Sequence, residues 1–192
     1  IYHPSIFGFN DELQPYNYDP EKAKELLAEA GYPDGITVSF GCPDGRYLRD
    51  RVICEAIVGQ FAEAGITAEL ETSEWGSFFQ SAVTGKQYDI YLLGWQAVDP
   101  FNQIAWWFTT EGSPNGYSNP RVDELVVEAQ ATLDDEEVRA MAEEIQQIVW
   151  DDLPWVSMYF QPQIYGKNLA LKDVVLQETI PQMDFMNAYM EE

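Results

Sequence analysis

Residues 36–95 read ITVSFGCPDGRYLRDRVICEAIVGQFAEAGITAELETSEWGSFFQSAVTGKQYDIYLLGW. Three segments of this stretch have the apolar or alternating composition of β-strands, and the two segments between them repeat apolar residues at helical spacing. The expected strands are residues 36–42, 66–71 and 88–95, and the expected helices are residues 46–64 and 73–84. Strands that alternate with helices in this way predict a parallel sheet with right-handed crossovers.

On either side of this stretch the sequence predicts mainly further helices. Asp19 and Pro20 are suited to the N-cap and first position of a helix, and Gly31 is suited to end it. The remaining expected elements are helices over residues 101–108, from Pro120 onward and over 134–150, and strands over 154–160 and 171–176. The first 18 residues and those after about 161 are otherwise irregular.

The charge balance is strongly acidic, with 33 Asp and Glu residues against 10 Lys and Arg residues and a formal net charge of -23. The acidic runs alternate with ordinary apolar periodicity, which indicates a folded domain with an acidic surface rather than an acidic tail. Such a charge repels itself and is best tolerated in high salt, so we expect a salt-loving source; an acidic mesophilic protein is the alternative. Nucleic acid is excluded as a partner because no basic patch is visible.

The sequence offers little catalytic chemistry. Its single histidine, His3, lies in the irregular leader, which argues against Ser-His-Asp and Cys-His nucleophiles and against a zinc site. Phosphate-binding glycine motifs are missing. Carboxylate pairs are so frequent in this chain that each is better interpreted as part of a solvated face. Neither a metal site nor a cofactor is expected.

Cys42 and Cys54 leave two states open. An oxidising compartment favours a disulfide, but two buried free thiols are the default expectation, and their spacing does not indicate zinc. No apolar run is long enough to span a membrane. The chain opens with Ile1, so we expect its natural beginning, with any targeting signal, to lie upstream.

The best candidate for a binding site is the segment after the third expected strand. In an open parallel sheet, ligands bind outside the carboxyl ends of the strands. Trp95, Gln96 and Asp99 follow that strand. Trp95 is a candidate for a flat apolar wall, and Asp99 is a candidate to pair with a cationic group. The alternative is that Asp99 caps the next helix and Trp95 fills the core.

Five segments, in order along the chain, resemble the peptide-type (family 5) extracellular solute-binding proteins. They are YDPEKAKELLAEAGY (18–32), QFAEAGI (60–66), YDI continuing to GW (88–95), YSNPRVDEL (117–125) and LPWV with Tyr159 (153–159). One such segment would carry little weight, but five in register across residues 15–160 make a specific resemblance.

The resemblance implies an α/β fold: a three-layer α/β/α lobe like those of periplasmic binding proteins, with a mixed, mostly parallel sheet. Residues 1–18 would be an inter-lobe leader, residues 19–160 the C-terminal lobe, and residues 161–192 a tail that returns to a missing N-terminal lobe. The implied source is haloarchaeal. Without the other lobe, the apolar residues of the tail are expected to favour self-association.

The implied role is capture of a dipeptide or oligopeptide outside the cell and delivery to the membrane permease of an ABC importer, with no catalytic step. Nickel or an oligosaccharide is the alternative ligand in the same role. A carboxylate-based hydrolase and an interaction module are less favoured hypotheses. In peptide-binding members an Asp shortly after the Gly-Trp pair holds the ligand's amino group. Asp99 is the matching residue, although it lies closer to the pair here than in those members. Membrane anchoring through the missing N-terminus is also expected.

Overall fold

The computed structural model describes residues 3–95, 100–162, 164–176 and 183–191. The chain comprises two compact units. Residues 14–95 make up the first, which we call the sheet unit, and residues 1–13 together with 96–192 make up the second, which we call the helical unit. The expected lobe boundaries near residues 18 and 160 refer to a longer two-lobed protein, and they stay a prediction.

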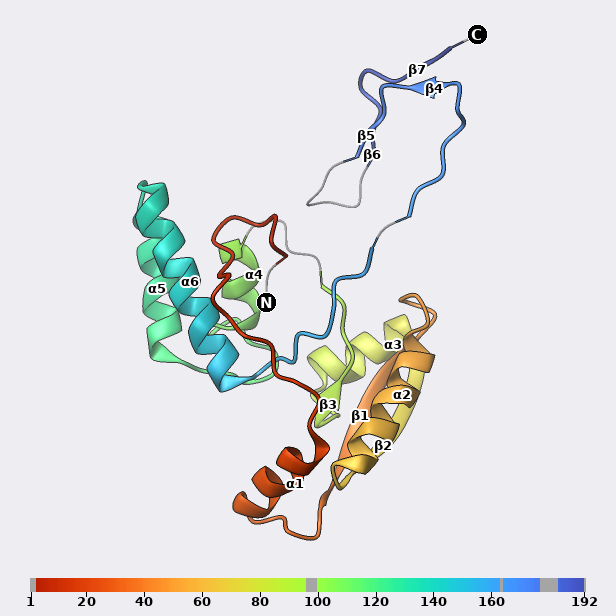
Figure 1. Cartoon of the computed structure of the whole chain (residues 1–192). Helices are drawn as coiled ribbons and strands as arrows, with labels where there is room; N and C mark the ends of the chain where they lie inside the picture. The colour runs from red at the N-terminus through yellow and green to blue at the C-terminus, as the bar shows by residue number, and fades with distance from the viewer. Residues whose placement is uncertain (1–2, 96–99, 163, 177–182, 192) are drawn as a thin grey trace. The chain divides into compact units, whose positions relative to one another are not determined.

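A three-stranded parallel sheet forms the centre of the sheet unit (Figure 1). Its strands are β1 (Ile36–Asp44), β2 (Ile66–Glu74) and β3 (Ile90–Tyr91), and their order across the sheet is β2-β1-β3. β1 pairs with β2 along its whole length but with β3 only at Phe40 and Gly41. The parallel sheet expected from the sequence is confirmed, and β1 is its central strand.

Helices cover both faces of this sheet. They are α2 (Asp50–Glu63) and α3 (Trp75–Phe79), which continues as the π-helical turn η1 (Gln80–Thr84). The helix α1 (Pro20–Glu29) precedes β1 and buries none of its residues. Ile57 of α2 packs in the cluster that contains Phe40 and Ile90, whereas Phe78 of α3 contacts the ring of Tyr91 at 6.3 Å between centroids. Successive residues of a strand point to opposite faces, so α2 and α3 lie on opposite sides. The expected α/β/α layering is confirmed.

Local signals explain several boundaries in the sheet unit. The Asp19 carboxylate accepts a hydrogen bond from the N–H of Lys22 at 2.9 Å, as an N-cap does. Gly31 follows the end of α1 with a φ of 93°, a backbone angle that favours glycine. Gly41 has no room for a side chain because the ring of Tyr88 lies against it. At each of these three positions, the residue type in the sequence fits the local conformation of the backbone.

Three helices form the described core of the helical unit (Figure 1). They are α4 (Pro100–Trp107), α5 (Pro120–Ala131) and α6 (Asp135–Asp152). Asn119 caps α5, as expected, by accepting a hydrogen bond from the N–H of Arg121 at 3.0 Å. The buried apolar side chains of these helices and the residues beside them include Ile104, Phe108, Val122, Leu125, Val126, Ala129, Ala142, Ile145 and Val149.

The irregular leader belongs to the helical unit through contacts with α6. The buried amide of Gln146 donates a hydrogen bond to the carbonyl of Gly8 and accepts one from the N–H of Asn10 at 3.4 Å. The side chain of Asn10 in turn donates to the carbonyl of Glu143 at 3.2 Å. Because these bonds join positions more than 130 residues apart, the leader is a structural part of this unit.

The last part of the chain forms two short antiparallel pairs. β4 (Leu171–Lys172) pairs with β7 (Tyr189–Met190), and β5 (Val175–Leu176) pairs with β6 (Met183–Asp184). The single strand expected over residues 171–176 is therefore broken in two. Asp173 causes the break because its φ of 53° is incompatible with an extended strand.

Three further expectations need correction. Residues 154–160 form no strand; Val156 is 70% exposed, and no strand of the described residues lies beside this segment to share hydrogen bonds. β3 is shorter than the predicted strand over residues 88–95. The helix expected from Arg46 begins only at Asp50, because the intervening residues fold into a turn around the Asp50 carboxylate.

Candidate binding site at the carboxyl edge of the sheet

The carboxyl ends of the three parallel strands meet at one edge of the sheet. β1 ends at Asp44, β2 ends at Glu74, and the segment after β3 continues to Trp95. The chain passes from β1 to β2 on one side and then returns to β3 on the other, so the strand order reverses beside β1. In open α/β sheets, ligands bind at the carboxyl edge beside such a reversal. We therefore regard this edge as the candidate site.

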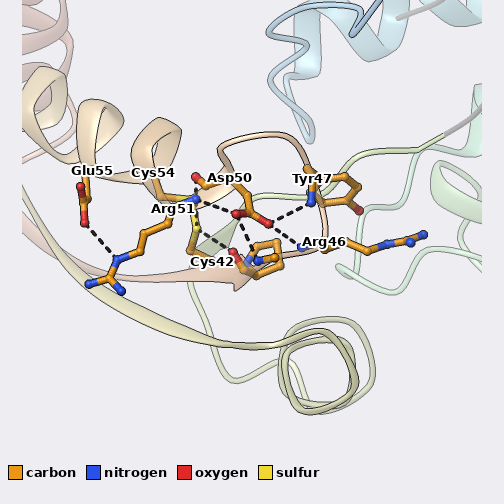
Figure 2. The surroundings of a disulfide bond; sticks show 9 residues. Cys42, Arg46, Tyr47, Asp50, Arg51, Cys54 and Glu55 are labelled. Atoms are coloured by element: carbon orange, nitrogen blue, oxygen red, sulfur yellow. Dashed lines mark hydrogen bonds and ion pairs between the residues drawn. A yellow bond between two sulfur atoms is a disulfide. The ribbon is translucent and has the colours of Figure 1, made fainter. Parts of the chain in front are cut away.

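A buried carboxylate shapes the turn between β1 and α2, residues 45–49, which we call the β1–α2 loop (Figure 2). Asp50, only 3% exposed, accepts hydrogen bonds from the backbone N–H groups of Gly45, Arg46, Tyr47 and Arg51 at 3.3, 2.8, 2.9 and 2.9 Å. Burial by itself raises the pKa of Asp50, but these four hydrogen bonds outweigh it and leave the pKa lowered. The carboxylate is therefore charged at neutral pH.

The β1–α2 loop presents a cation and two aromatic rings at this edge. The Arg46 guanidinium lies over the Trp75 ring at 4.6 Å from its centroid and 5.6 Å from that of Tyr47. The two rings meet edge to face at 6.1 Å, and the Tyr47 hydroxyl donates to the carbonyl of Gly94 at 3.0 Å. Residues that follow β1, β2 and β3 thus converge. We call Arg46, Tyr47 and Trp75 the edge cluster.

Arg46 is exposed and makes no ion pair with the described residues. A guanidinium is planar, and contact of its face with aromatic rings leaves the N–H donors at its edge available to a carboxylate. The edge cluster can therefore bind an anionic group and pack against a flat or apolar one.

Cys42 and Cys54 form a disulfide, so the default expectation of two free thiols is wrong (Figure 2). Cys42 lies near the end of β1 on the face covered by α2, and Cys54 lies on the inward side of α2. Their Cα atoms are 6.4 Å apart, within the range that a disulfide spans. The disulfide encloses the whole β1–α2 loop together with Asp50.

Of the three residues predicted for the site, the structure describes only one. Trp95 follows Gly94 at the candidate edge and is 43% exposed, so it does not fill the core. Gln96 and Asp99 lie outside the described residues. A ligand-binding role for all three stays a prediction.

Sequence reasoning missed the edge cluster. It treated Arg46 and Tyr47 as the start of a helix and Trp75 as part of an apolar stripe. The signal that could have found them was position: each follows the carboxyl end of a predicted parallel strand, as Trp95 does. The rule that ligands bind outside the carboxyl ends of parallel strands led to Trp95 after the third strand, and it applied equally to the residues after the first two strands.

Other kinds of site find no support in the described part of the chain. No three His, Cys, Asp or Glu side chains there are grouped so that they could hold a metal ion. The helices described include none that is both long and apolar enough to cross a membrane.

The sequence matches the family model "Bacterial extracellular solute-binding proteins, family 5 Middle" over residues 1–115. The dipeptide-binding protein of Escherichia coli K12 is 31% identical over 161 residues, which are 79% of this chain and 30% of that protein. Heme-binding protein A of Haemophilus influenzae is 32% identical over 162 residues, 80% of this chain and 29% of that protein. The chain thus spans about a third or less of the length of these curated relatives.

Solved structures agree with this match. An ABC transporter-associated periplasmic binding protein from Helicobacter pylori, in complex with the peptide STSA, has a TM-score of 0.71 and 29% identity over 80% of this chain and 31% of that one. The clavulanic acid biosynthesis oligopeptide binding protein 2 has a TM-score of 0.87 over 100% of this chain and 38% of that one, and at 18% identity it shows a shared fold. With the family model matching more than half of its residues, the chain belongs to family 5 of the bacterial extracellular solute-binding proteins.

Proposed function

We propose that this chain is the C-terminal lobe of a peptide-capturing solute-binding protein that serves an ABC importer, and that Arg46 binds a carboxylate of the ligand. The observation that carries the proposal is the guanidinium of Arg46 at the carboxyl edge of the sheet, which lies over the ring of Trp75 and makes no ion pair with a described residue. The 29% identical structure in complex with a peptide and the 31% identical dipeptide-binding protein support the ligand class.

A peptide has a negative end, a positive end and a polar backbone, and the candidate residues include a counterpart for each. Arg46 would take the carboxylate, Trp95 and Trp75 would supply flat apolar walls, and Gln96 would bond to a backbone amide. Asp99 would hold the amino group. Capture would need an opposing lobe, so that closure turns binding into a shape that the permease recognises.

Proteins of family 5 bind solutes for transport and are not enzymes, so a hydrolase needs no further consideration. The ligand is less narrowly defined, because the relatives include proteins named for heme and glutathione as well as for dipeptides. A nickel ion would be repelled by the Arg46 guanidinium, and a neutral oligosaccharide would offer it hydroxyl acceptors but no opposite charge. The edge cluster therefore favours a ligand that carries a carboxylate.

The rest of the proposed protein follows from the two-lobe scheme. The missing lobe would cover apolar side chains of the tail such as Ile164 and Leu169, which are 91% and 87% exposed. Without that lobe, these side chains would drive self-association. The protein would work outside the cell, attached to the membrane through a segment that precedes this chain.

The test is isothermal titration of the full-length protein that carries this chain, with the peptide STSA and the dipeptide Met-Leu as probes, each as the free acid and as the C-terminal amide. We expect Arg46→Gln to weaken binding of the free acids by about 10- to 100-fold, because a charge-assisted hydrogen-bond pair is lost. The amides should bind weakly to the wild type and be little affected by Arg46→Gln.

The matched control is Arg49→Gln, which removes the same charge from the same loop at an exposed residue. It should leave binding nearly unchanged. Wild-type protein that binds neither probe would refute peptide capture, and equal binding of acid and amide would refute the role of Arg46. Micromolar binding by residues 1–192 alone would contradict the need for an opposing lobe.

A further inference from the structure

We infer that Asp50, together with the Cys42–Cys54 disulfide, is a positioning device that holds the β1–α2 loop in its binding shape before the ligand arrives. The inference rests on the proposed function, because it assigns to Asp50 the task of presenting Arg46. Asp50 itself does not touch the ligand in this scheme. It acts through the backbone of the loop.

The first observation is the number of donors that converge on one buried carboxylate. Asp50 is 3% exposed and has no salt bridge to a described Lys or Arg, so its charge is balanced by the four backbone N–H groups alone. A carboxylate is the only side chain with two oxygens that accept and nothing that donates. An unpaired buried charge is costly, so it persists here because the loop satisfies it.

The second observation is the direction of the loop's side chains. The N–H groups of Arg46 and Tyr47 point inward to Asp50, and Figure 2 shows the Arg46 side chain extending away from the disulfide. The backbone thus sets where the Arg46 side chain leaves the loop, and the rings of Trp75 and Tyr47 then hold its guanidinium. The Tyr47 hydroxyl then joins the loop to the segment after β3 through the carbonyl of Gly94. Arg46 is therefore positioned by contacts within the protein, before any ligand is present.

The third observation is that the loop has an unfavourable backbone geometry. Arg49, immediately before α2, has a φ of 58°, in the left-handed region that non-glycine residues rarely adopt. Such a residue persists when its surroundings fix it, and such residues cluster where function needs a defined shape. Two restraints fix this one: the Asp50 hydrogen bonds, and the disulfide that closes the chain from Cys42 to Cys54.

The test measures affinity for the free-acid peptide STSA in the full-length protein as a double-mutant cycle. Asp50→Asn keeps the shape of the side chain but turns an NH2 group toward the backbone donors. We expect it to weaken binding by about 3- to 10-fold, the cost of ordering the loop and the Arg46 side chain on binding. In an Arg46→Gln background the same substitution should not weaken binding further, because the guanidinium that Asp50 positions is absent.

Asp34→Asn is the matched control, since it removes an exposed carboxylate before β1, at the end of that strand opposite the loop, and should leave affinity unchanged. Reduction of the wild-type disulfide, verified by thiol counting, gives a second arm that needs no substitution in case Asp50→Asn does not fold. Reduced protein should lose affinity with Arg46 present and lose none with Gln at that position.

The outcomes separate the inference from the proposed function. If wild-type protein binds and Arg46→Gln weakens binding while Asp50→Asn and reduction do not, the proposed function stands and the inference is overturned. An equal loss from Asp50→Asn with and without Arg46 also overturns it, since Asp50 would then act on general stability. If the wild type binds no peptide, both fail.

Discussion

Reduction of the Cys42–Cys54 disulfide should lower the free energy of unfolding of the sheet unit by about 3 kcal/mol. The two cysteines are separated by 12 positions, and the chain-entropy relation gives that magnitude for a closed loop of this size. The effect arises in the unfolded chain, which gains freedom when the loop opens. In the folded state both sulfur atoms stay buried between β1 and α2, so few contacts are lost.

Hydrogen exchange followed by mass spectrometry can measure this change within each unit. Peptides from β1 and α2 report on the sheet unit, and peptides from α5 and α6 serve as an internal control because the disulfide lies entirely in the sheet unit. We expect protection to fall by about two orders of magnitude in β1 and α2, which corresponds to about 3 kcal/mol, and to change little in α5 and α6. A Cys42→Ala/Cys54→Ala variant should behave like the reduced protein and be insensitive to reductant.

The reasoning would be refuted if protein with two titratable thiols kept the protection of the oxidised form. It would also be refuted if protection in α5 and α6 fell as much as in β1 and α2, since the loss would then not be confined to the enclosed loop and its unit.

Three further predictions concern charge, pH and packing. Raising potassium chloride from about 0.1 M to about 1 M shortens the Debye length from about 10 Å to about 3 Å. Because this screening weakens the self-repulsion of a chain with a net charge of -23, its melting temperature should rise in a calorimetric scan. An unchanged melting temperature would argue against a salt-adapted surface. Burial and the Asp152 carboxylate, 2.5 Å from the Tyr117 hydroxyl, raise the pKa of Tyr117. Its stabilisation is therefore present below the unfolded value of about 10 and lost as pH rises toward the folded value. Tyr117→Phe should cost about 1 kcal/mol at pH 7 and remove this alkaline loss in urea unfolding, and an unchanged alkaline limb would contradict the assignment. Gly94→Ala would put a Cβ 2.8 Å from the Tyr47 ring, so the ring must move. The free energy of peptide binding measured by calorimetry should weaken by about 1 kcal/mol, while the circular dichroism spectrum stays native. Unaltered affinity would exclude Tyr47 from the site.

The sequence predicted the layers of the sheet unit because their signals are local. The apolar stripe of α5 and the caps at Asp19 and Asn119 act within a few residues, and the structure has them where the periodicity placed them. In α2 the apolar residue that is buried is Cys54. The segment 154–160 shows the limit of such signals. Its apolar composition is compatible with a strand, but a strand also needs a neighbour, and no local pattern reports one.

The start of α2 and the state of the cysteines escaped prediction for a related reason. Residues 46–49 have no sequence feature that forbids a helix; they leave the helix because Asp50 collects their N–H groups from inside. The proximity of Cys42 and Cys54 likewise depends on how the β1–α2 loop folds back, which their spacing alone does not reveal. Both errors concern a loop that is shaped by one buried carboxylate.

A binding site of this kind also leaves no motif of reactive residues, because capture needs position rather than catalysis. The charge of the chain gives further information about the class of ligand. A chain with a net charge of -23 repels anions, so in the proposed role the exposed Arg46, which has no ion pair with a described residue, would favour the approach of a carboxylate to the edge of the sheet. A ligand with a second, positive end would be attracted by the surrounding acidic surface while its carboxylate meets Arg46. A zwitterionic peptide satisfies both conditions, whereas a purely anionic ligand of the same size would have to overcome the repulsion of the whole surface. The acidic composition and the guanidinium of Arg46 therefore favour the same class of ligand.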